Sequence, residues 1–272
     1  MFKTVRESFR ITNNNIIIAT PLILFSLISS IYLIFSANGS KTGVIFAVIL
    51  FFLMAGAFLS GWFYMIKEAV EEPDTDSRKL FSDFPSGVGE YFLSVLGLIV
   101  QVIIISSLIM LAAFIAGKKF IGAVGVSYDQ FSQALTSVET MKTFVNSLNQ
   151  EQLIKINNWN MLMFFTMIIN SFILMLYPMV LFFKEKNPFK ALFITFKDTF
   201  SHRFFKNTGL FIMVFVLYMF VSLCAMLAGN NVILHFIVTL INFYYATFVG
   251  VLLFNYYYSN FIKIGSNIDT TV

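Results

Sequence analysis

Among the polar residues inside the long apolar stretches, four side chains are best placed to do chemistry. Gln101, Asn170 and Asn242 carry amides, and His235 carries an imidazole. An unbonded amide in hydrocarbon is costly, so each should face another helix or a wet cavity. Two interpretations stay open: interhelical hydrogen bonds, or a pathway for a neutral solute lined by the three amides. For His235 we favour bundle packing or interfacial solvation, because a proton relay would need an acidic partner in the membrane.

The rest of the sequence lacks the residue sets typical of enzymes and metalloproteins. Its one cysteine, Cys224, excludes a Cys-based metal cluster. His202 and His235 stand far apart and without flanking acids, which argues against a His-built metal site. An acidic run from Glu71 to Asp83 lacks the glycine and final Glu of a calcium loop. The sequence carries no nucleotide-binding loop, zincin motif, nucleophile elbow or DNA-reading element. We therefore expect no enzymatic activity, cofactor, metal or nucleic-acid partner.

Composition predicts a membrane protein. The chain has 272 residues, of which 58% are hydrophobic and 12% charged, and its mean hydropathy is +0.82. A soluble domain of this length would carry about 25% charged residues. A membrane span needs about 20 apolar residues, and six stretches qualify. The predicted spans, none of which contains Asp, Glu, Lys or Arg, are Ile16–Ser36, Gly43–Ile66, Tyr91–Ala116, Trp159–Phe183, Gly209–Ala228 and Asn231–Tyr258.

The segment 187–206 predicts an amphipathic helix in the plane of the membrane surface. Asn187 suits the N-cap and Pro188 the first helical position. Aromatic side chains recur at three- and four-residue steps on one face, and basic side chains fall largely off it. The predicted membrane-surface anchors are Phe189, Phe196, Lys190, Lys197, Arg203 and Lys206.

Similar segments precede two other spans and predict an internal repeat. Residues 2–12 and 77–90 also combine apolar and charged faces, although Pro85 should interrupt the second helix. The predicted fold is thus all-α, with six transmembrane helices arranged as three hairpins. Each hairpin follows an amphipathic helix on the cytoplasmic side.

Orientation follows from the basic residues of the connecting segments. The side that holds the amphipathic helices carries most of them: Lys3, Arg6, Arg10, Lys67, Arg78, Lys79, Lys184, Lys186, Lys190, Lys197, Arg203, Lys206 and Lys263. The opposite side carries Lys41, Lys118, Lys119, Lys142 and Lys155. Both termini are therefore predicted to be cytoplasmic.

The long outer loop, residues 117–158, has helical signals of its own. Ser127 with Gln130 forms a capping-box pattern, and Asn149 with Gln152 marks a second helix start. An apolar stripe lies between these starts. We interpret the loop as a helical hairpin resting on the outer leaflet; a lid over a cavity and a docking surface for an envelope partner are the alternatives.

Three stretches lead into or out of spans in a shared pattern. They are FKTVRESFRITNNNIII, SRKLFSDFPSGVGEYFL and YPMVLFFKEKNPFKALFITFKDTF. In these stretches and in its hydropathy, the chain resembles a group of bacterial six-span proteins that includes the YciC-like inner-membrane proteins and the membrane domain attached to some glycerophosphodiester phosphodiesterases. The resemblance implies an all-helical integral protein of the bacterial inner membrane. It supplies no catalytic residues, and no hydrolase activity carries over.

Two functions are compatible with these features. The first is a non-catalytic subunit or organiser of a bacterial envelope membrane assembly, with anionic lipid headgroups and one or more membrane proteins as partners. Charge-free spans, aromatic surface helices and a structured outer loop favour it. The alternative is a transporter or permease subunit for a neutral or lipophilic solute. Repeated hairpins and a hinge at Pro178 favour transport, while the absence of intramembrane charge argues against ion coupling.

Overall fold

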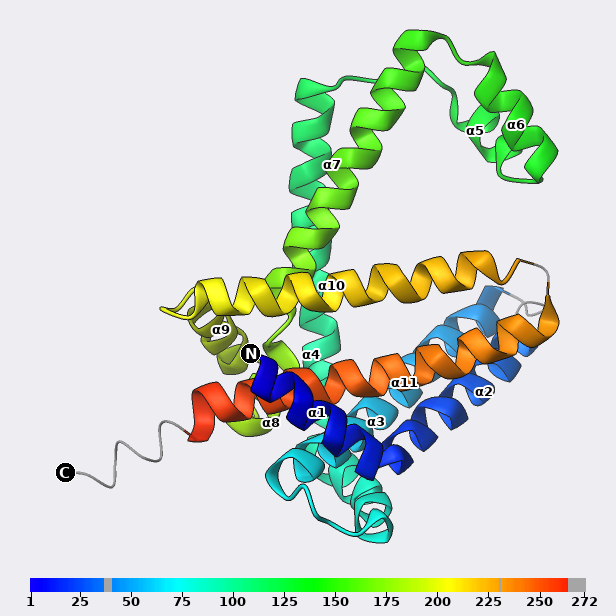
Figure 1. The fold of residues 1–272 in the computed structure, drawn as a ribbon. Coiled ribbons are helices and arrows are strands. Elements are labelled where there is room, and N and C mark those ends of the chain that lie inside the picture. The colour runs from blue at the N-terminus through cyan, green and yellow to red at the C-terminus, as the bar shows by residue number, and fades with distance from the viewer. Residues whose placement is uncertain (37–40, 230, 264–272) are drawn as a thin grey trace. The chain divides into compact units, whose positions relative to one another are not determined.

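The computed structural model describes residues 1–36, 41–229 and 231–263, and their regular secondary structure is entirely helical (Figure 1). The helices are α1 (Phe2–Asn14), η1 (Ile16–Ile18), α2 (Ala19–Ser36), α3 (Lys41–Glu71), α4 (Ser77–Phe120), α5 (Tyr128–Ala134), α6 (Val138–Ser147), α7 (Gln150–Leu174), α8 (Tyr177–Phe183), α9 (Pro188–Thr199), α10 (Phe204–Leu227), α11 (Val232–Tyr257) and the π-helix η2 (Tyr258–Ile262).

Five of the described helical segments are long and apolar enough to cross a membrane. A sixth is obtained when α1 and the segment Ile16–Tyr32, which meet at 79°, count as one bent span. The chain is therefore an all-α polytopic membrane protein, and the predicted fold class is confirmed.

The chain divides into two compact units. Unit 1 comprises Met1–Gln101 and Ile173–Val272, and unit 2 comprises Val102–Phe172. Helices α4 and α7 contribute residues to both units, since each passes through a boundary between them.

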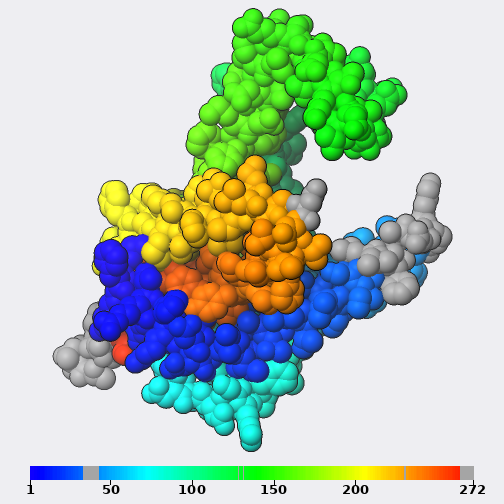
Figure 2. Space-filling view, turned by 45° about the vertical axis from the view of Figure 1, so that its right-hand side comes forward, coloured from blue at the N-terminus to red at the C-terminus, as the bar shows by residue number. Residues whose placement is uncertain are grey.

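Helix α11 is the centre of unit 1. It packs against α1, α2, α3, α8 and α10. Figure 2 shows α1, in dark blue, lying directly on the orange-red α11. One core cluster joins Leu210 of α10 to Phe248, Leu252 and Tyr256 of α11. Packing of this kind, with interhelical hydrogen bonds, holds helices together where lipid removes the hydrophobic driving force.

The sharp turn between α1 and α2 is made at Asn15. Its side-chain Nδ2 donates to the Ile11 carbonyl at 3.1 Å, and its own carbonyl accepts from the Ile18 N–H at 3.0 Å. The Ile11 carbonyl also accepts from the Asn15 backbone N–H at 3.0 Å, so Asn15 bonds the last turn of α1 through both its side chain and its backbone. Helix α1 can therefore lie at an angle of 79° to the chain that follows it.

In unit 2, residue Trp159 holds the ends of α4 and α7 together. Its ring packs on Gly117, where an added Cβ would come within 2.5 Å of the indole Cζ3. The indole N–H donates to the carbonyl of Gly122 at 3.1 Å. Gly122 has a φ of +82°, a conformation that glycine adopts without strain and that lets the chain leave α4. Trp159, the first residue of the predicted fourth span, is thus an interhelical clamp.

The prediction that Pro85 interrupts a separate surface helix at 77–90 is wrong, because α4 is continuous from Ser77 to Phe120. Pro85 lies about two turns inside the helix, where its missing N–H removes one backbone hydrogen bond. Close packing holds the helix in line: an added Cβ on Gly87 would come within 2.9 Å of the Ser60 carbonyl oxygen in α3.

The prediction of one helix over 187–206 is also wrong. Helix α9 ends at Thr199 and α10 begins at Phe204. Asn207 causes the break, because its Nδ2 donates to the carbonyls of Asp198 and Thr199, each at 3.0 Å. Those carbonyls are the open acceptors at the end of α9. Lys206 consequently belongs to the first turn of α10.

Glycine substitutions in α4 test its packing on α9. An added Cβ on Gly97 would lie 2.6 Å from the Pro188 Cγ, whereas nothing lies within 4 Å of a Cβ on Gly89. We expect Gly97→Ala to cost about 1–3 kcal/mol, because the proline ring cannot turn away. Gly89→Ala should stabilise the same helix by about 0.5–1 kcal/mol. Thermal unfolding in one detergent measures both, and a gain in stability for both variants would contradict the contact.

Candidate functional site

Gln101 is buried in unit 1 and connects three helices. The hydroxyl of Tyr177, in α8, has one proton and donates it to the carbonyl of Pro188 at 2.8 Å. The Gln101 amide nitrogen must then face this hydroxyl, which lies 2.6 Å away. In that orientation the amide oxygen accepts from the Phe189 N–H at 3.2 Å. Only 5% of Gln101 and none of Tyr177 is exposed, so these groups depend on each other for hydrogen bonds.

This arrangement attaches the first turn of α9 to α4. Asn187 caps the helix as predicted: its Oδ1 accepts from Phe189 N at 3.0 Å and from Lys190 N at 3.3 Å. Gln101 supplies a further acceptor from a different helix. The geometry is that of an interhelical clamp, because every polar atom of the Gln101 side chain is used within the protein.

The other predicted polar residues lie in different surroundings. Asn170 is in unit 2, where its Nδ2 donates to the Ser106 Oγ at 2.9 Å, and its Oδ1 is buried without a partner in the described part of the chain. Asn242 is exposed on α11. His235 is also exposed, and its Nε2 contacts the Gly229 carbonyl. Gln101 and Asn242 therefore share no buried polar environment.

A polar network that the sequence reasoning missed lies where α9 meets the end of α11. Asp198 is 8% exposed and receives a 2.9 Å salt bridge from Lys184. The hydroxyl of Tyr257, a fully buried residue, donates to the same carboxylate oxygen at 2.5 Å. The Lys184 ammonium also lies 5.2 Å from the centre of the Tyr257 ring. A buried charge of this kind is tolerated because it is both paired and hydrogen-bonded.

Arg203 extends this network. Its guanidinium donates to Asn260 Oδ1 at 2.6 Å and lies 5.2 Å from the centre of the Phe261 ring. Asn207 joins it to the helix core, since its Oδ1 accepts from the Tyr256 hydroxyl at 2.8 Å. Arg203, predicted as a lipid anchor, thus contacts protein groups of η2.

The remaining predicted anchors are exposed on α9 and the start of α10. They are Phe189, Phe196, Lys190, Lys197 and Lys206. The opposite side of α9 is buried and consists of small or polar residues: Ala191, Thr195, Asp198 and Thr199. The signal that would have identified the network is Asp198 itself, a single acid in phase with two small residues.

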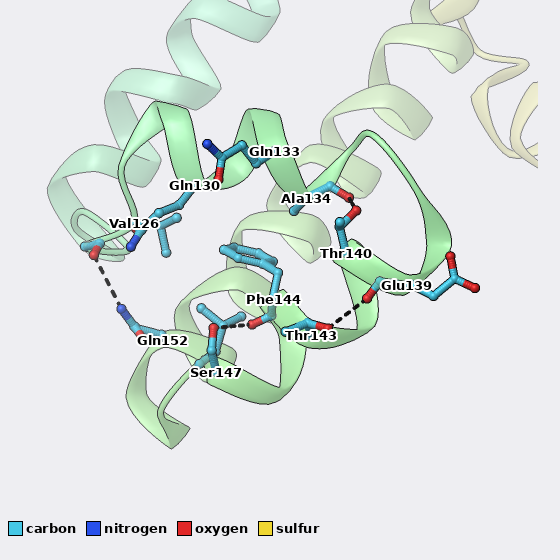
Figure 3. A pocket seen from close by; sticks show the side chains of 12 residues that line it. Val126, Gln130, Gln133, Ala134, Glu139, Thr140, Thr143, Phe144, Ser147 and Gln152 are labelled. Atoms are coloured by element: carbon cyan, nitrogen blue, oxygen red, sulfur yellow. Dashed lines mark hydrogen bonds between the residues drawn. The ribbon is translucent and has the colours of Figure 1, made fainter.

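Unit 2 carries a hollow of about 470 Å³ between α5, α6 and the start of α7 (Figure 3). Its lining residues are Gly125, Val126, Gln130, Gln133, Ala134, Glu139, Thr140, Thr143, Phe144, Ser147, Leu148 and Gln152. Among the described lining residues, the ring of Phe144 lies with the apolar Val126, Ala134 and Leu148, several residues bring amides or hydroxyls, and Glu139 brings a carboxylate. A mixed lining of polar and apolar groups suits a surface of the same mixed kind, such as a peptide segment.

Both predicted capping patterns are present in this hairpin. Ser127 Oγ accepts from Gln130 N at 3.2 Å, and Asn149 Oδ1 accepts from Gln152 N at 2.8 Å. A third cap, at Ser137, separates α5 from α6. The predicted apolar stripe is therefore divided between two short helices.

The acidic connection between α3 and α4 is a solvated turn. The Lys79 ammonium donates to Glu72 at 2.9 Å and holds the pKa of that carboxyl below its usual value. Thr75 donates to the same oxygen at 3.2 Å. Among the described residues, no group of three or more His, Cys, Asp or Glu is placed to hold a metal ion.

The chain matches no protein-family profile, no characterised protein and no solved structure. Function is therefore inferred from the arrangement of its own residues.

Substitution of Asp198 tests the network. Asp198→Ala leaves Lys184 and Tyr257 without their shared acceptor. We expect a loss of about 2–3 kcal/mol, less than for a fully buried pair because Lys184 is partly exposed. Lys197→Ala, one residue earlier and exposed, should change stability by less than about 0.5 kcal/mol. Equal melting temperatures for the two variants in detergent would show that the network does not hold α9 in place.

Proposed function

We propose that this chain is a non-catalytic protein of the bacterial cytoplasmic membrane that packs within, or organises, a larger membrane assembly. Both termini lie on the cytoplasmic side in this proposal. The main support is that the intramembrane polar groups of unit 1 form hydrogen bonds within the protein. Few of their donors and acceptors are left to bind a solute.

Three contacts illustrate this support. Gln101 bonds to Tyr177 and to the first turn of α9. Asn255 of α11 donates to Ser8 Oγ of α1 at 3.0 Å. Trp62 of α3 donates its indole proton to the Ile18 carbonyl at 3.0 Å. A pathway for a polar solute needs unsatisfied donors and acceptors along its wall, whereas these groups serve helix packing.

The element that we assign to partner contact is the α5–α6 hairpin with its hollow. Ser127 and Ser137 cap its two helices and Asn149 caps the following α7, so the hairpin presents a defined surface. Leu135 and Val138 are 62% and 70% exposed on it. Apolar side chains beside a polar hollow are typical of protein-binding surfaces.

Contact of α9 with lipid is also compatible with a role in a membrane assembly. The exposed Phe189, Phe193 and Phe196 suit the acyl boundary, while Lys190 and Lys197 suit anionic headgroups. Each such lysine contributes about 1 kcal/mol of attraction to an anionic surface. We infer that α9 is an anchor on the cytoplasmic surface.

Purification from the native membrane in a mild detergent tests the proposal. We expect a membrane-protein partner at a fixed ratio by quantitative mass spectrometry. Phe144→Ala, which removes the ring from the hollow, should lower partner recovery about tenfold or more. Lys142→Ala, an exposed change on the same helix, should leave recovery unchanged. A monomer without a partner at native expression level would contradict the assembly function.

Transport of a neutral solute is the second candidate, because one apolar helical stretch is interrupted. Residues Met175 and Leu176 form a turn between α7 and α8, and Pro178 lies in the first turn of α8. Broken helices often form the substrate sites of transporters. A Gln101→Cys change in a Cys224→Ser background separates the two functions. Rapid reaction with a water-soluble maleimide would indicate a wet pathway, whereas protection supports the assembly.

A further inference from the structure

A polar cavity of about 390 Å³ lies in unit 1 among the ends of three helices. It is formed by α1, by the last turn of α3 with the residues after it, and by the end of α11 with η2. The lining residues are Lys3, Thr4, Glu7, Val70, Glu71, Pro73, Asn255, Tyr258, Ser259 and Lys263. No predicted site residue belongs to it.

Charged groups of both signs line the cavity. Lys3 and Lys263 bring ammonium groups, and Glu7 and Glu71 bring carboxylates. Glu71 already has a partner, since Lys67 lies 2.8 Å from it. Lys3 and Glu7 form no ion pair within the described part of the chain. A ligand that carries both an anionic and a cationic group would match this lining, whereas a simple anion or cation would meet a like charge.

The wall behind these charges is well ordered by hydrogen bonds. Asn255 is 3% exposed; its Nδ2 donates to Ser8 Oγ at 3.0 Å, and its Oδ1 accepts from Ser259 Oγ at 3.2 Å. Helix α11 then changes to the π-helix η2, which places Tyr258 and Ser259 on the lining. Single π-turns within α-helices occur frequently at functional sites.

The position of the cavity indicates a lipid ligand. It lies where the apolar part of α3 ends, beside the first turns of α1. Phe2 and Ile16, near the two ends of α1, are 93% and 64% exposed, as expected for a helix whose apolar side rests in the acyl boundary. Polar groups at the ends of spans meet the headgroup region of a bilayer.

We propose that this cavity binds the phosphoethanolamine headgroup of an aminophospholipid. Lys3 and Lys263 contact the phosphate, and Glu7 accepts hydrogen bonds from the primary ammonium. A choline headgroup has the same charges, but its quaternary nitrogen has no proton to donate. A glycerol headgroup keeps the phosphate and lacks the cation. Glu7 therefore selects among lipids, and the two lysines provide binding that all of them share.

Competition among lipids tests this proposal. The detergent-purified full-length chain is mixed with equal amounts of phosphatidylethanolamine, phosphatidylcholine and phosphatidylglycerol of the same acyl composition. Native mass spectrometry then counts the lipid retained. We expect phosphatidylethanolamine to exceed phosphatidylcholine about tenfold, the effect of a hydrogen bond to a charged group. Glu7→Gln should abolish this preference, and Lys3→Gln should lower retention of all three lipids.

Arg6→Gln is the matched control, because it removes a basic residue of the same helix that does not line the cavity. It should leave both the amount and the preference unchanged, and the melting temperature of each variant checks its fold. Equal retention of phosphatidylethanolamine and phosphatidylcholine by the unmodified chain would overturn the proposal. So would a loss on Arg6→Gln as large as that on Lys3→Gln. Binding of soluble phosphoethanolamine as tight as that of the lipid would assign the cavity to a soluble ligand instead.

Discussion

The structure of unit 1 depends on one constraint: a polar group placed among apolar helices must find its partner within the protein. Gln101 meets it through Tyr177 and the first turn of α9, and Asn255 meets it through α1. Each bond joins elements far apart in the sequence, so the few polar residues of the spans determine which helices are neighbours. Helix α11 is central because it offers such groups, together with close-packed aromatic rings, to several helices.

The same constraint explains the ends of the helices. Charged residues are absent from the interior of the spans and gather where the helices end, and some of them pack between protein elements there. Asp198 is buried because Lys184 and Tyr257 satisfy it, and the Arg203 guanidinium is satisfied by Asn260. The charged residues at these helix ends are therefore an ordered part of the fold.

Hydropathy and capping patterns were sufficient to predict the helical class and the caps at Asn187, Ser127 and Asn149. They could not predict the continuity of α4 or the end of α9. Both depend on contacts with residues outside the local window: Gly87 on α3, and Asn207 reaching back to the end of α9. A periodic pattern shows which face of a helix is apolar. It does not show where the helix ends when the end depends on a side chain that comes later in the sequence.

Helix α9 shows why the polar network was missed. An amphipathic pattern divides a helix into an apolar and a polar face, but a surface helix of a membrane protein has three environments: lipid, water and protein. On α9 one set of exposed side chains is aromatic, another exposed set is basic, and the buried side is small or polar. Asp198 belongs to the third side, which a two-way division assigns to water. Because close helix packing favours small residues, a polar residue in phase with Ala191 and Thr195 indicates a protein contact, and the same criterion can be applied to Ser8 and Thr12 on α1, which are buried as well.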